Sequence, residues 1–263
     1  MSRDMYRKLN PSGSQPREIS EVVNNLVEGK SNNTGEVTLA TGNATTTTIY
    51  DERIGYNSII LLTPISTAAG NDAVPYGAFQ DLTDQTIAST TTAYAMTLNT
   101  TDYSNGVYLS NSSRMNVRNA GTYNFQWSGQ FVNTDTQLQD VSVWLRKNGT
   151  DITGSAGFVS VPNSHGGTNG HIIAGWNYFL ELAANDYIEL YWYATSITVS
   201  LQFLASGTSP TRPSTASLIA TMNYVSPSAS TNVYVSARTK GSATLKHFAN
   251  DTADKTYGYI IVG

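Results

Sequence analysis

The side chains of this chain that could do chemistry are few, and the first candidates are its three histidines. His165 and His171 bracket a glycine-rich loop that could bring two imidazoles together at its apex. A first-row metal would need a third ligand, and the loop holds neither a carboxylate nor a thiolate. His247 lies on a predicted strand, where a histidine is more often packed or at the surface than catalytic. We therefore predict no metal site.

Carboxylates that could act as acid and base are equally scarce. Asp81 and Asp84 lie close together in a turn-like segment, where such a pair is usually a solvated surface feature. Residues 99–106 (NTTDYSNG) offer oxygen ligands for calcium, but they lack EF-hand spacing and are better explained as a turn. No nucleophile elbow and no histidine with an orienting acid is visible. We expect no catalytic residue and no cofactor, and the protein is predicted not to be an enzyme.

The elements that would position any site are strands. In residues 121–132 (GTYNFQWSGQFV) aromatic residues alternate with polar ones, as in a strand with one buried face. Val141, Val143 and Leu145 should face inward just before Asn148-Gly149, a strong hairpin signal. Strands follow one another at short intervals without helices between them. This pattern predicts an all-β fold whose antiparallel strands form a sandwich or jelly roll.

Composition narrows the choice of partners. The 263 residues include no cysteine, so stability must come from packing or from association between chains. A net charge of -4 gives no attraction for phosphate backbones, and we expect no nucleic-acid partner. No stretch approaches the about 20 apolar residues of a membrane span, so no membrane insertion is expected. The N-terminus lacks an apolar signal core, which predicts synthesis in a cytosol.

An amphipathic helix is predicted near the N-terminus, between Pro16 and Glu28. Pro16 suits its first turn and Gly29 its end. Its apolar stripe, the helix stripe, consists of Ile19, Val22, Val23, Leu26 and Val27. A helix this short is marginal alone in water, so the stripe must dock on its own domain, or else on a partner or on symmetry-related copies of the chain. Both readings stay open.

A second candidate surface is a row of tyrosines in residues 187–193. Period-two alternation puts Ile188, Leu190 and Trp192 on one face. Tyr187, Tyr191 and Tyr193 fall on the opposite face, and we call them the tyrosine row. Such a row is typical of a trimer interface or of a platform on which sugars stack.

The chain divides into three predicted parts. Residues 1–34 form an N-terminal anchor segment that contains the helix. A small antiparallel β module follows in residues 35–78 and resumes in residues 226–263. Residues 79–225 carry their own strands and turns, which predicts a second domain inserted into the first.

Two stretches of the inserted block resemble a known family. Ala120–Phe125 (AGTYNF) and Leu182–Leu190 (LAANDYIEL) are similar to the Gly-x-Tyr-x-Phe and Leu-x-x-Gly-Asp-x-Val-x-Leu strands of C1q and TNF-like jelly rolls, with Asn185 where that family often has Gly. The likeness covers a little over half of the chain. It implies a C1q/TNF-like jelly roll and a homotrimer with aromatic residues at the three-fold interface, and it favours the interface reading of the tyrosine row.

The flanks resemble a small β module of tailed-bacteriophage structural proteins, including those of marine and cyanobacterial phages. The likeness rests on residues 29–67 and 232–263, which are contiguous in that module and interrupted here. It implies a non-enzymatic virion protein, made in the host cytoplasm, and we expect a trimeric tail fibre that contacts a host receptor, a surface glycan or protein. The helix stripe would then dock on a tail adaptor or the capsid. The alternatives are a head fibre or capsid decoration protein, and a lectin-like glycan-binding module.

Overall fold

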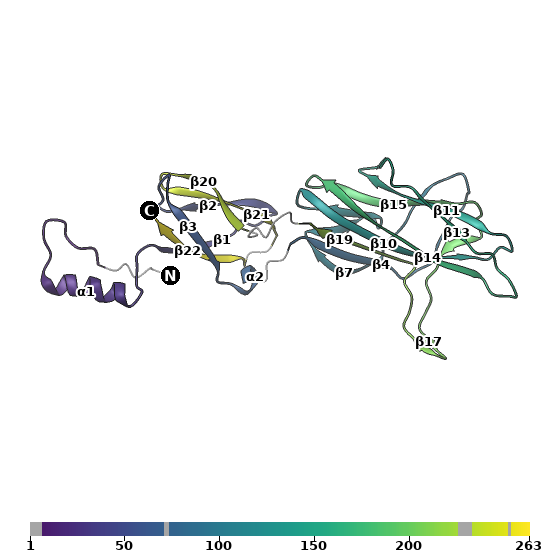
Figure 1. The fold of residues 1–263 in the computed structure, drawn as a ribbon, viewed down its shortest axis with the longest axis horizontal. Coiled ribbons are helices and arrows are strands. Elements are labelled where there is room, and N and C mark those ends of the chain that lie inside the picture. The colour runs from purple at the N-terminus through teal and green to yellow at the C-terminus, as the bar shows by residue number, and fades with distance from the viewer. Residues whose placement is uncertain (1–6, 71–73, 226–232, 252–253) are drawn as a thin grey trace. The chain divides into compact units, whose positions relative to one another are not determined.

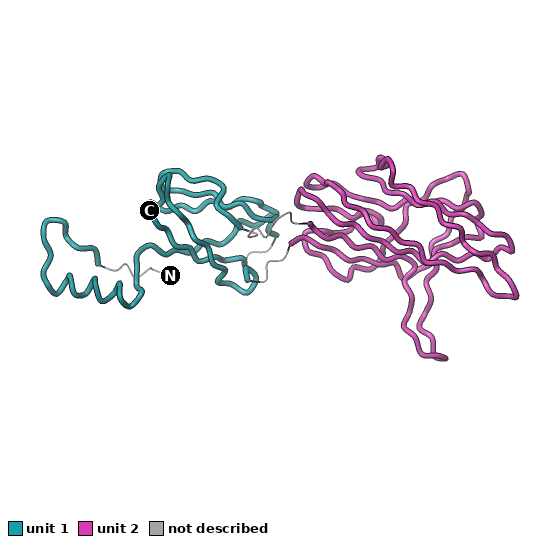
Figure 2. Tube along the Cα trace, viewed as in Figure 1, with its two compact units in different colours: residues 1–72, 231–263 teal, residues 73–230 magenta. Residues whose placement is uncertain are grey.

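The structure is a computed structural model that describes residues 7–70, 74–225, 233–251 and 254–263. It is mostly β, with 55% strand in antiparallel sheets, 7% helix and a short N-terminal helix, which confirms the predicted class (Figure 1). The chain forms two compact units, unit 1 (residues 1–72 and 231–263) and unit 2 (residues 73–230) (Figure 2). The boundary expected before residue 79 falls inside strand β4 (Tyr76–Asp81), all of which pairs within unit 2.

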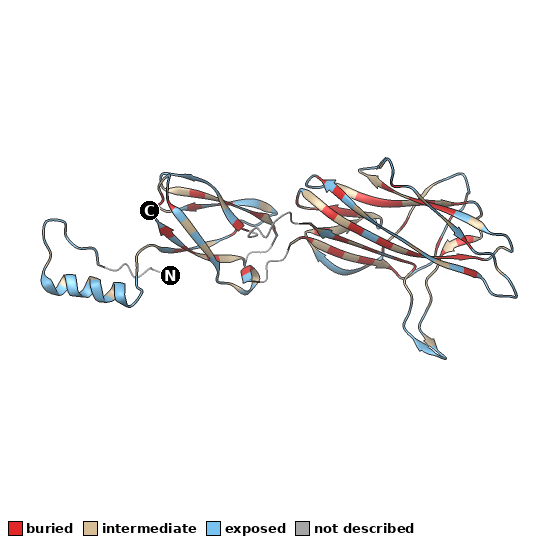
Figure 3. Ribbon diagram, viewed as in Figure 1, coloured by how far each residue is buried: buried red, intermediate tan, exposed pale blue. Residues whose placement is uncertain are grey.

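Helix α1 (Pro16–Val27) begins at the predicted proline. The backbone N–H of Gln15, the residue just before the helix, donates to the Glu18 carboxylate at 3.0 Å. This backbone N–H, which no helical hydrogen bond can satisfy, thereby gains a partner. At the other end, Gly29 N–H donates to Leu26 O and Lys30 N–H donates to Asn25 O, so the last turn is closed by backbone bonds. None of the residues of α1 is buried (Figure 3).

Unit 1 is built from two three-stranded antiparallel sheets, β1-β22-β3 and β2-β21-β20, with the four-residue helix α2 (Thr67–Gly70). Their strands are β1 (Thr34–Thr38), β2 (Ala44–Tyr50), β3 (Ile59–Pro64), β20 (Val233–Thr239), β21 (Ser242–Asn250) and β22 (Thr256–Val262). The turn at Lys240-Gly241 joins β20 to β21. Aliphatic side chains such as Leu39, Ile49 and Leu245 form the core together with Tyr257 and Tyr259.

Unit 2 contains two larger antiparallel sheets. In the first, β5, β16, β10, β19, β4 and β7 follow in that order, and β14 pairs with β10. Its strands are β4, β5 (Gln85–Thr86), β7 (Thr100–Asn105), β10 (Gly121–Asn133), β14 (Gly170–Leu182), β16 (Val199–Leu201) and β19 (Leu218–Tyr224). In the second sheet the order is β12, β11, β15, β9 and β8, while β13 pairs with β11 and β6 with β15. Its strands are β6 (Tyr94–Ala95), β8 (Val107–Ser110), β9 (Arg114–Val117), β11 (Gln139–Lys147), β12 (Thr150–Asp151), β13 (Gly157–Val161) and β15 (Tyr187–Ala194). A separate hairpin joins β17 (Gly207–Thr208) to β18 (Thr211–Arg212).

One apolar core serves both sheets of unit 2. The predicted inward residues of β10 are buried, as are those of β11 and β15; they are Tyr123, Phe125, Trp127, Phe131, Val141, Val143, Leu145, Ile188, Leu190 and Trp192. Phe131 of the first sheet meets Trp192 of the second, with ring centroids 5.7 Å apart. The alternation in the sequence therefore identified this core correctly.

The predicted turn at residues 99–106 is wrong. Thr100–Asn105 forms strand β7, which pairs with β4, and only Gly106 has the positive φ of a turn residue. The Thr and Tyr side chains of this segment suit an edge strand, and pairing with β4 outweighs the local turn tendency of Asp and Asn.

Candidate functional site

The residues first considered for chemistry are held in structural roles. Buried His247 contacts Thr47 Oγ1 through Nε2 at 2.9 Å and the Phe248 carbonyl oxygen through Nδ1 at 2.7 Å. His171 is exposed and contacts Gln202 Oε1 at 2.9 Å. The part of the chain that the structure describes contains no group of three His, Cys, Asp or Glu residues that could hold a metal ion.

Asp81 differs from the expectation of a solvated carboxylate pair. It is 1% exposed and accepts hydrogen bonds from the backbone N–H of Thr83 at 2.8 Å, Thr97 Oγ1 at 2.8 Å and Asn99 Nδ2 at 2.9 Å. Asp84 is exposed, and its carboxylate accepts the backbone N–H of Phe203 at 2.7 Å. Asp81 is therefore a buried acceptor that fixes the end of β4, and the prediction of a solvated pair was wrong for this residue.

The tyrosine row lies on β15, where contacts within unit 2 cover much of it. Tyr187 is half-buried under the Arg114 guanidinium, 4.4 Å from the ring centroid. The Arg146 guanidinium lies 3.8 Å from the Tyr191 centroid. Trp144 is 6.2 Å from Tyr191 and 6.1 Å from Tyr193, between ring centroids. The row is thus packed against its own strands, and less of it is free for a partner than the sequence suggested.

A buried carboxylate reinforces this packing. Glu189, between Tyr187 and Tyr191, is 5% exposed and accepts hydrogen bonds from Ser113 Oγ at 2.7 Å and Arg114 Nε at 3.3 Å. The Arg114 guanidinium above the Tyr187 ring is therefore also bonded to the Glu189 carboxylate, which lies on the same face of β15.

The large exposed apolar side chains of unit 2 gather elsewhere, on β13 and β14. The β13–β14 edge, as we call this surface, comprises Phe158, Ile173, Trp176 and Phe179. These four side chains are between 60% and 75% exposed. Trp176 and Phe179 project from opposite faces of β14, so these apolar side chains flank the free edge of the strand on both sides, and a sheet edge flanked in this way is a candidate interaction surface.

Strand β14 is an unprotected edge of its sheet. All thirteen of its residues pair with β10, and the described residues give it no second partner strand. Natural edges are usually short or carry Lys or Pro, whereas GHIIAGWNYFLEL has neither and holds one acidic residue, Glu181. A long apolar edge of this kind is a template for association with another chain.

Between β13 and β14 the two sheets leave an apolar cleft of about 250 Å³. We call it the edge cleft. Its lining residues are Trp127, Val143, Gly157, Phe158, Val159, Ile173, Ala174, Gly175, Trp176 and Tyr178. Trp176 stacks on Tyr178 with ring centroids 6.4 Å apart. Burial raises the pKa of Tyr178, whose hydroxyl donates to the Ser155 carbonyl at 2.8 Å.

The chemistry of the edge cleft favours an apolar occupant. No charged side chain lines it, and the buried indole Nε1 of Trp127 has no hydrogen-bond partner among the described residues. A sugar site needs several converging polar side chains in addition to a ring on which to stack. The cleft is therefore better suited to apolar side chains of a protein segment than to a sugar.

Sequence reasoning missed this surface, although β14 carries a signal. Apolar side chains lie on both of its faces, because Ile172 and Ile173 are adjacent, as are Phe179 and Leu180. That pattern departs from the one-faced alternation of β10 and indicates a second contact surface. The sequence does not reveal that β14 lies at an edge, since pairing is set by residues far away in the chain.

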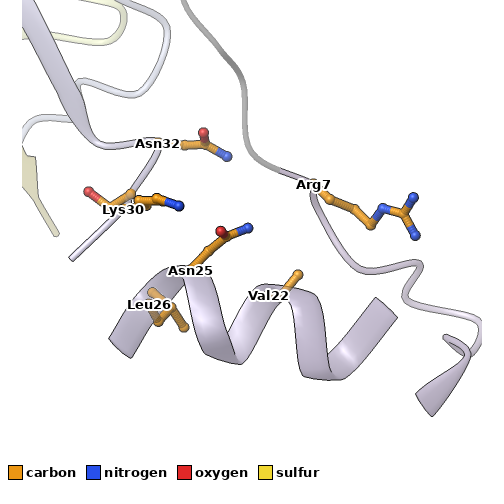
Figure 4. Close-up of a pocket in the computed structure, with 7 residues that line it drawn as sticks. Arg7, Val22, Asn25, Leu26, Lys30 and Asn32 are labelled. Carbon is orange, nitrogen blue, oxygen red and sulfur yellow. The ribbon is translucent and has the colours of Figure 1, made fainter. Parts of the chain in front are cut away.

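The helix stripe is exposed as well. Ile19, Val23, Leu26 and Val27 are between 44% and 82% exposed, and half-buried Val22 lines a small hollow with Arg7, Asn25 and Lys30 (Figure 4). Arg7 is held there by Glu18, whose carboxylate it meets at 2.8 Å. The stripe is thus available for docking. In the described parts of the chain, neither helix has the length and apolar character needed to cross a membrane.

In comparisons with protein-family models and with curated proteins, nothing matches the chain.

Proposed function

We propose that this chain is a non-enzymatic structural protein of a phage virion that assembles as a homotrimer, and that it forms part of a tail fibre or similar tail appendage. The observation that carries the assembly is the uncovered β13–β14 edge, where four large apolar side chains flank a strand whose outer backbone edge has no partner strand among the described residues. The virion context is supported by the likeness of residues 29–67 and 232–263 to a phage β module.

A jelly roll is the fold that we propose for unit 2. Its long strands cross repeatedly between the two sheets: β10 lies in the first, β11 and β13 in the second, β14 in the first and β15 again in the second. Crossing of this kind is typical of Greek-key connections, from which jelly rolls are built. Together with the C1q/TNF-like stretches around β10 and β15, it supports a module that associates through one side of its sheets.

Attachment to the virion is assigned to the helix stripe. An amphipathic helix without buried residues needs a surface to cover it, and grooves of other proteins commonly do so. A tail adaptor is the partner that we favour, and a capsid protein is the alternative. Replacing Val23 and Leu26 by Ser should prevent incorporation into particles while the chain still folds and self-associates.

Light scattering of the purified full chain tests the assembly. We expect a trimer at micromolar concentration, and Trp176→Ser should weaken it by at least about 2 kcal/mol, or about thirtyfold in dissociation constant, because buried aromatic anchors dominate interfaces. Tyr103→Ser is the matched control. Tyr103 is 64% exposed on β7, which is an edge strand of the same sheet and is separated from β14 by β10, β19 and β4 in the pairing order. A wild-type monomer at this concentration would overturn the proposal.

The location and the ligand need separate experiments. Cryo-electron microscopy of intact particles should place density for Pro16–Val27 at the tail; density on the capsid lattice would instead identify a decoration protein. A glycan array tests the lectin alternative. Saturable sugar binding that Trp176→Ser abolishes would make the edge cleft a glycan site, in conflict with its apolar lining.

A further inference from the structure

Residues 204–215 form a hairpin arm, which Figure 1 shows standing away from the sheets of unit 2 at the β17 label. At its root the backbones of Leu204 and Thr215 exchange two hydrogen bonds, of 3.1 and 2.8 Å. Further out, Gly207 pairs with Arg212 and Thr208 with Thr211. We call residues 204–215 the arm.

The arm is not supported by packing within its own unit. Every residue from 205 to 214 is exposed except Gly207, which is half-buried. The Arg212 guanidinium donates to the carbonyls of Ala205, at 2.9 Å, and Pro213, at 3.2 Å, so its contacts stay inside the arm. Isolated two-stranded hairpins are marginal in water, and this segment has no large apolar side chain between residues 205 and 214 to anchor it. A projecting arm of this kind needs an outside surface to hold it in one conformation.

The sequence of the arm indicates what that surface should be. Its tip reads Pro210-Thr211-Arg212-Pro213, two prolines separated by two residues. Pro210 lies in the turn between β17 and β18 and Pro213 follows β18, so the exposed hairpin presents two apolar proline rings, and grooves lined by aromatic side chains are the surfaces that bind such rings. The edge cleft of the same unit is lined by Trp127, Trp176, Tyr178 and Phe158.

We propose that the arm of one copy docks Pro210–Pro213 into the edge cleft of a neighbouring copy. The inference rests on the self-association proposed above and identifies the segment that fills the cleft. The proline rings match its apolar lining, and the Arg212 side chain can lie over the exposed Trp176 ring. The free outer backbone edge of β14 offers hydrogen-bond partners to the arm.

A neighbouring copy fits better than the same chain. The arm leaves the sheet between β16 and β19, both of which pair with one side of β10, while β14 pairs with the other side. The root of the arm and β14 therefore lie on opposite sides of β10, and the arm stands away from the sheets of its own unit (Figure 1). In the single chain the arm and the edge cleft are both left uncovered, and an exchange between copies covers both at once.

Cysteine pairs give a direct test, because the chain contains no cysteine of its own. Full-length Thr208→Cys, in the arm, is mixed and re-associated with a differently tagged Ile173→Cys, on β14 at the edge cleft. A disulfide between the two chains on a non-reducing gel is expected. Thr101→Cys, exposed on β7, replaces Ile173→Cys as the matched control and should give no such product. Equal cross-linking of the arm to both positions, or a trimer without any cross-link to position 173, would overturn the inference.

A second measurement removes the prolines and needs no cysteine. Full-length Pro210→Ser/Pro213→Ser, confirmed as folded by circular dichroism, should associate about tenfold more weakly and show a red shift of tryptophan fluorescence as Trp176 becomes wet. Ser206→Ala/Ser214→Ala is the control with an intact tip. If wild type is a trimer and the proline variant matches it in both readouts, the arm does not fill the cleft while the proposed assembly stands. If wild type is monomeric, both fail.

Discussion

The two units of this chain bury their interiors in different ways. Unit 2 packs large rings, with Tyr123, Phe125 and Trp192 each at most 1% exposed in one core that serves both sheets. Unit 1 has a smaller, mainly aliphatic core, and polar bonds tie its strands together. Tyr259 on β22 donates to the Asp51 carboxylate at 2.9 Å, and Asp51 also holds Arg53. Unit 2 also holds buried polar groups such as Asp81 and Glu189, but its large ring core supplies packing that the two three-stranded sheets of unit 1 lack, so a single polar contact should matter more in unit 1.

The largest expected effect is on the ring packing of unit 2. Phe125→Ala should cost about 3 to 5 kcal/mol, since it removes buried area and leaves a cavity. All four tryptophans lie in unit 2, so fluorescence during urea unfolding follows this unit alone. Gln126→Ala, exposed on the adjacent position of β10, is the control and should stay within about 0.5 kcal/mol of wild type. A loss below about 1 kcal/mol for Phe125→Ala would contradict the assignment of this core.

Removing one tyrosine hydroxyl from each unit gives a matched comparison. Tyr259→Phe breaks a bond to a charged carboxylate and should cost unit 1 about 2 kcal/mol. Tyr123→Phe breaks a neutral bond to the Asn119 carbonyl at 2.8 Å and should cost unit 2 about 1 kcal/mol. Hydrogen exchange measured peptide by peptide reports both units. The reverse order would show that the polar contacts of unit 1 are incidental.

Acid should weaken unit 1 through the same carboxylate. Hydrogen bonds from Arg53 hold the pKa of Asp51 at about 2, below its ordinary 3.8. Because the folded pKa is the lower one, the stabilisation is complete above about pH 4 and disappears as the pH falls through 2. The loss should be about 1 to 2 kcal/mol, measured by hydrogen exchange of β1 and β22. Burial alone would raise the pKa of Asp186 in unit 2, but hydrogen bonds from Lys147 and Asn148 together outweigh it and lower this pKa.

The variant Asp51→Asn distinguishes the acid response of Asp51 in unit 1 from the acid response of unit 2. In Asp51→Asn the β1 and β22 peptides should exchange faster at neutral pH and lose their extra sensitivity between pH 4 and pH 2. Unit 2 should keep its own acid response. An unchanged acid response of unit 1 in this variant would assign the effect to another group.

The sequence predicted the features that depend on local pattern. Alternation identified the buried face of β10, and the turn residues Asn148-Gly149 marked the end of β11, because both signals lie within a few residues. It did not predict that Asp81 is buried, since its partners Thr97 and Asn99 come from a later segment. The β13–β14 edge was missed for the same reason: whether a strand has one neighbour or two is decided by distant residues.

The smallest effects test whether turns differ between the units as cores do. Gly149 in unit 2 has φ +81° and Gly241 in unit 1 has φ +83°, and each closes a hairpin. Alanine at either position should cost about 1 kcal/mol, because a Cβ is disfavoured in left-handed backbone. The space is also similar: nothing lies within 4 Å of a Cβ at 241, and the nearest atom at 149 is the Tyr187 hydroxyl at 3.6 Å. Equal losses, measured by hydrogen exchange, would make the cost a property of the backbone alone. A clearly larger loss for Gly241→Ala would mean that the contrast between the units extends to their turns, since the Gly241 N–H donates to the Ile54 carbonyl at 2.8 Å and so couples that turn to the smaller core.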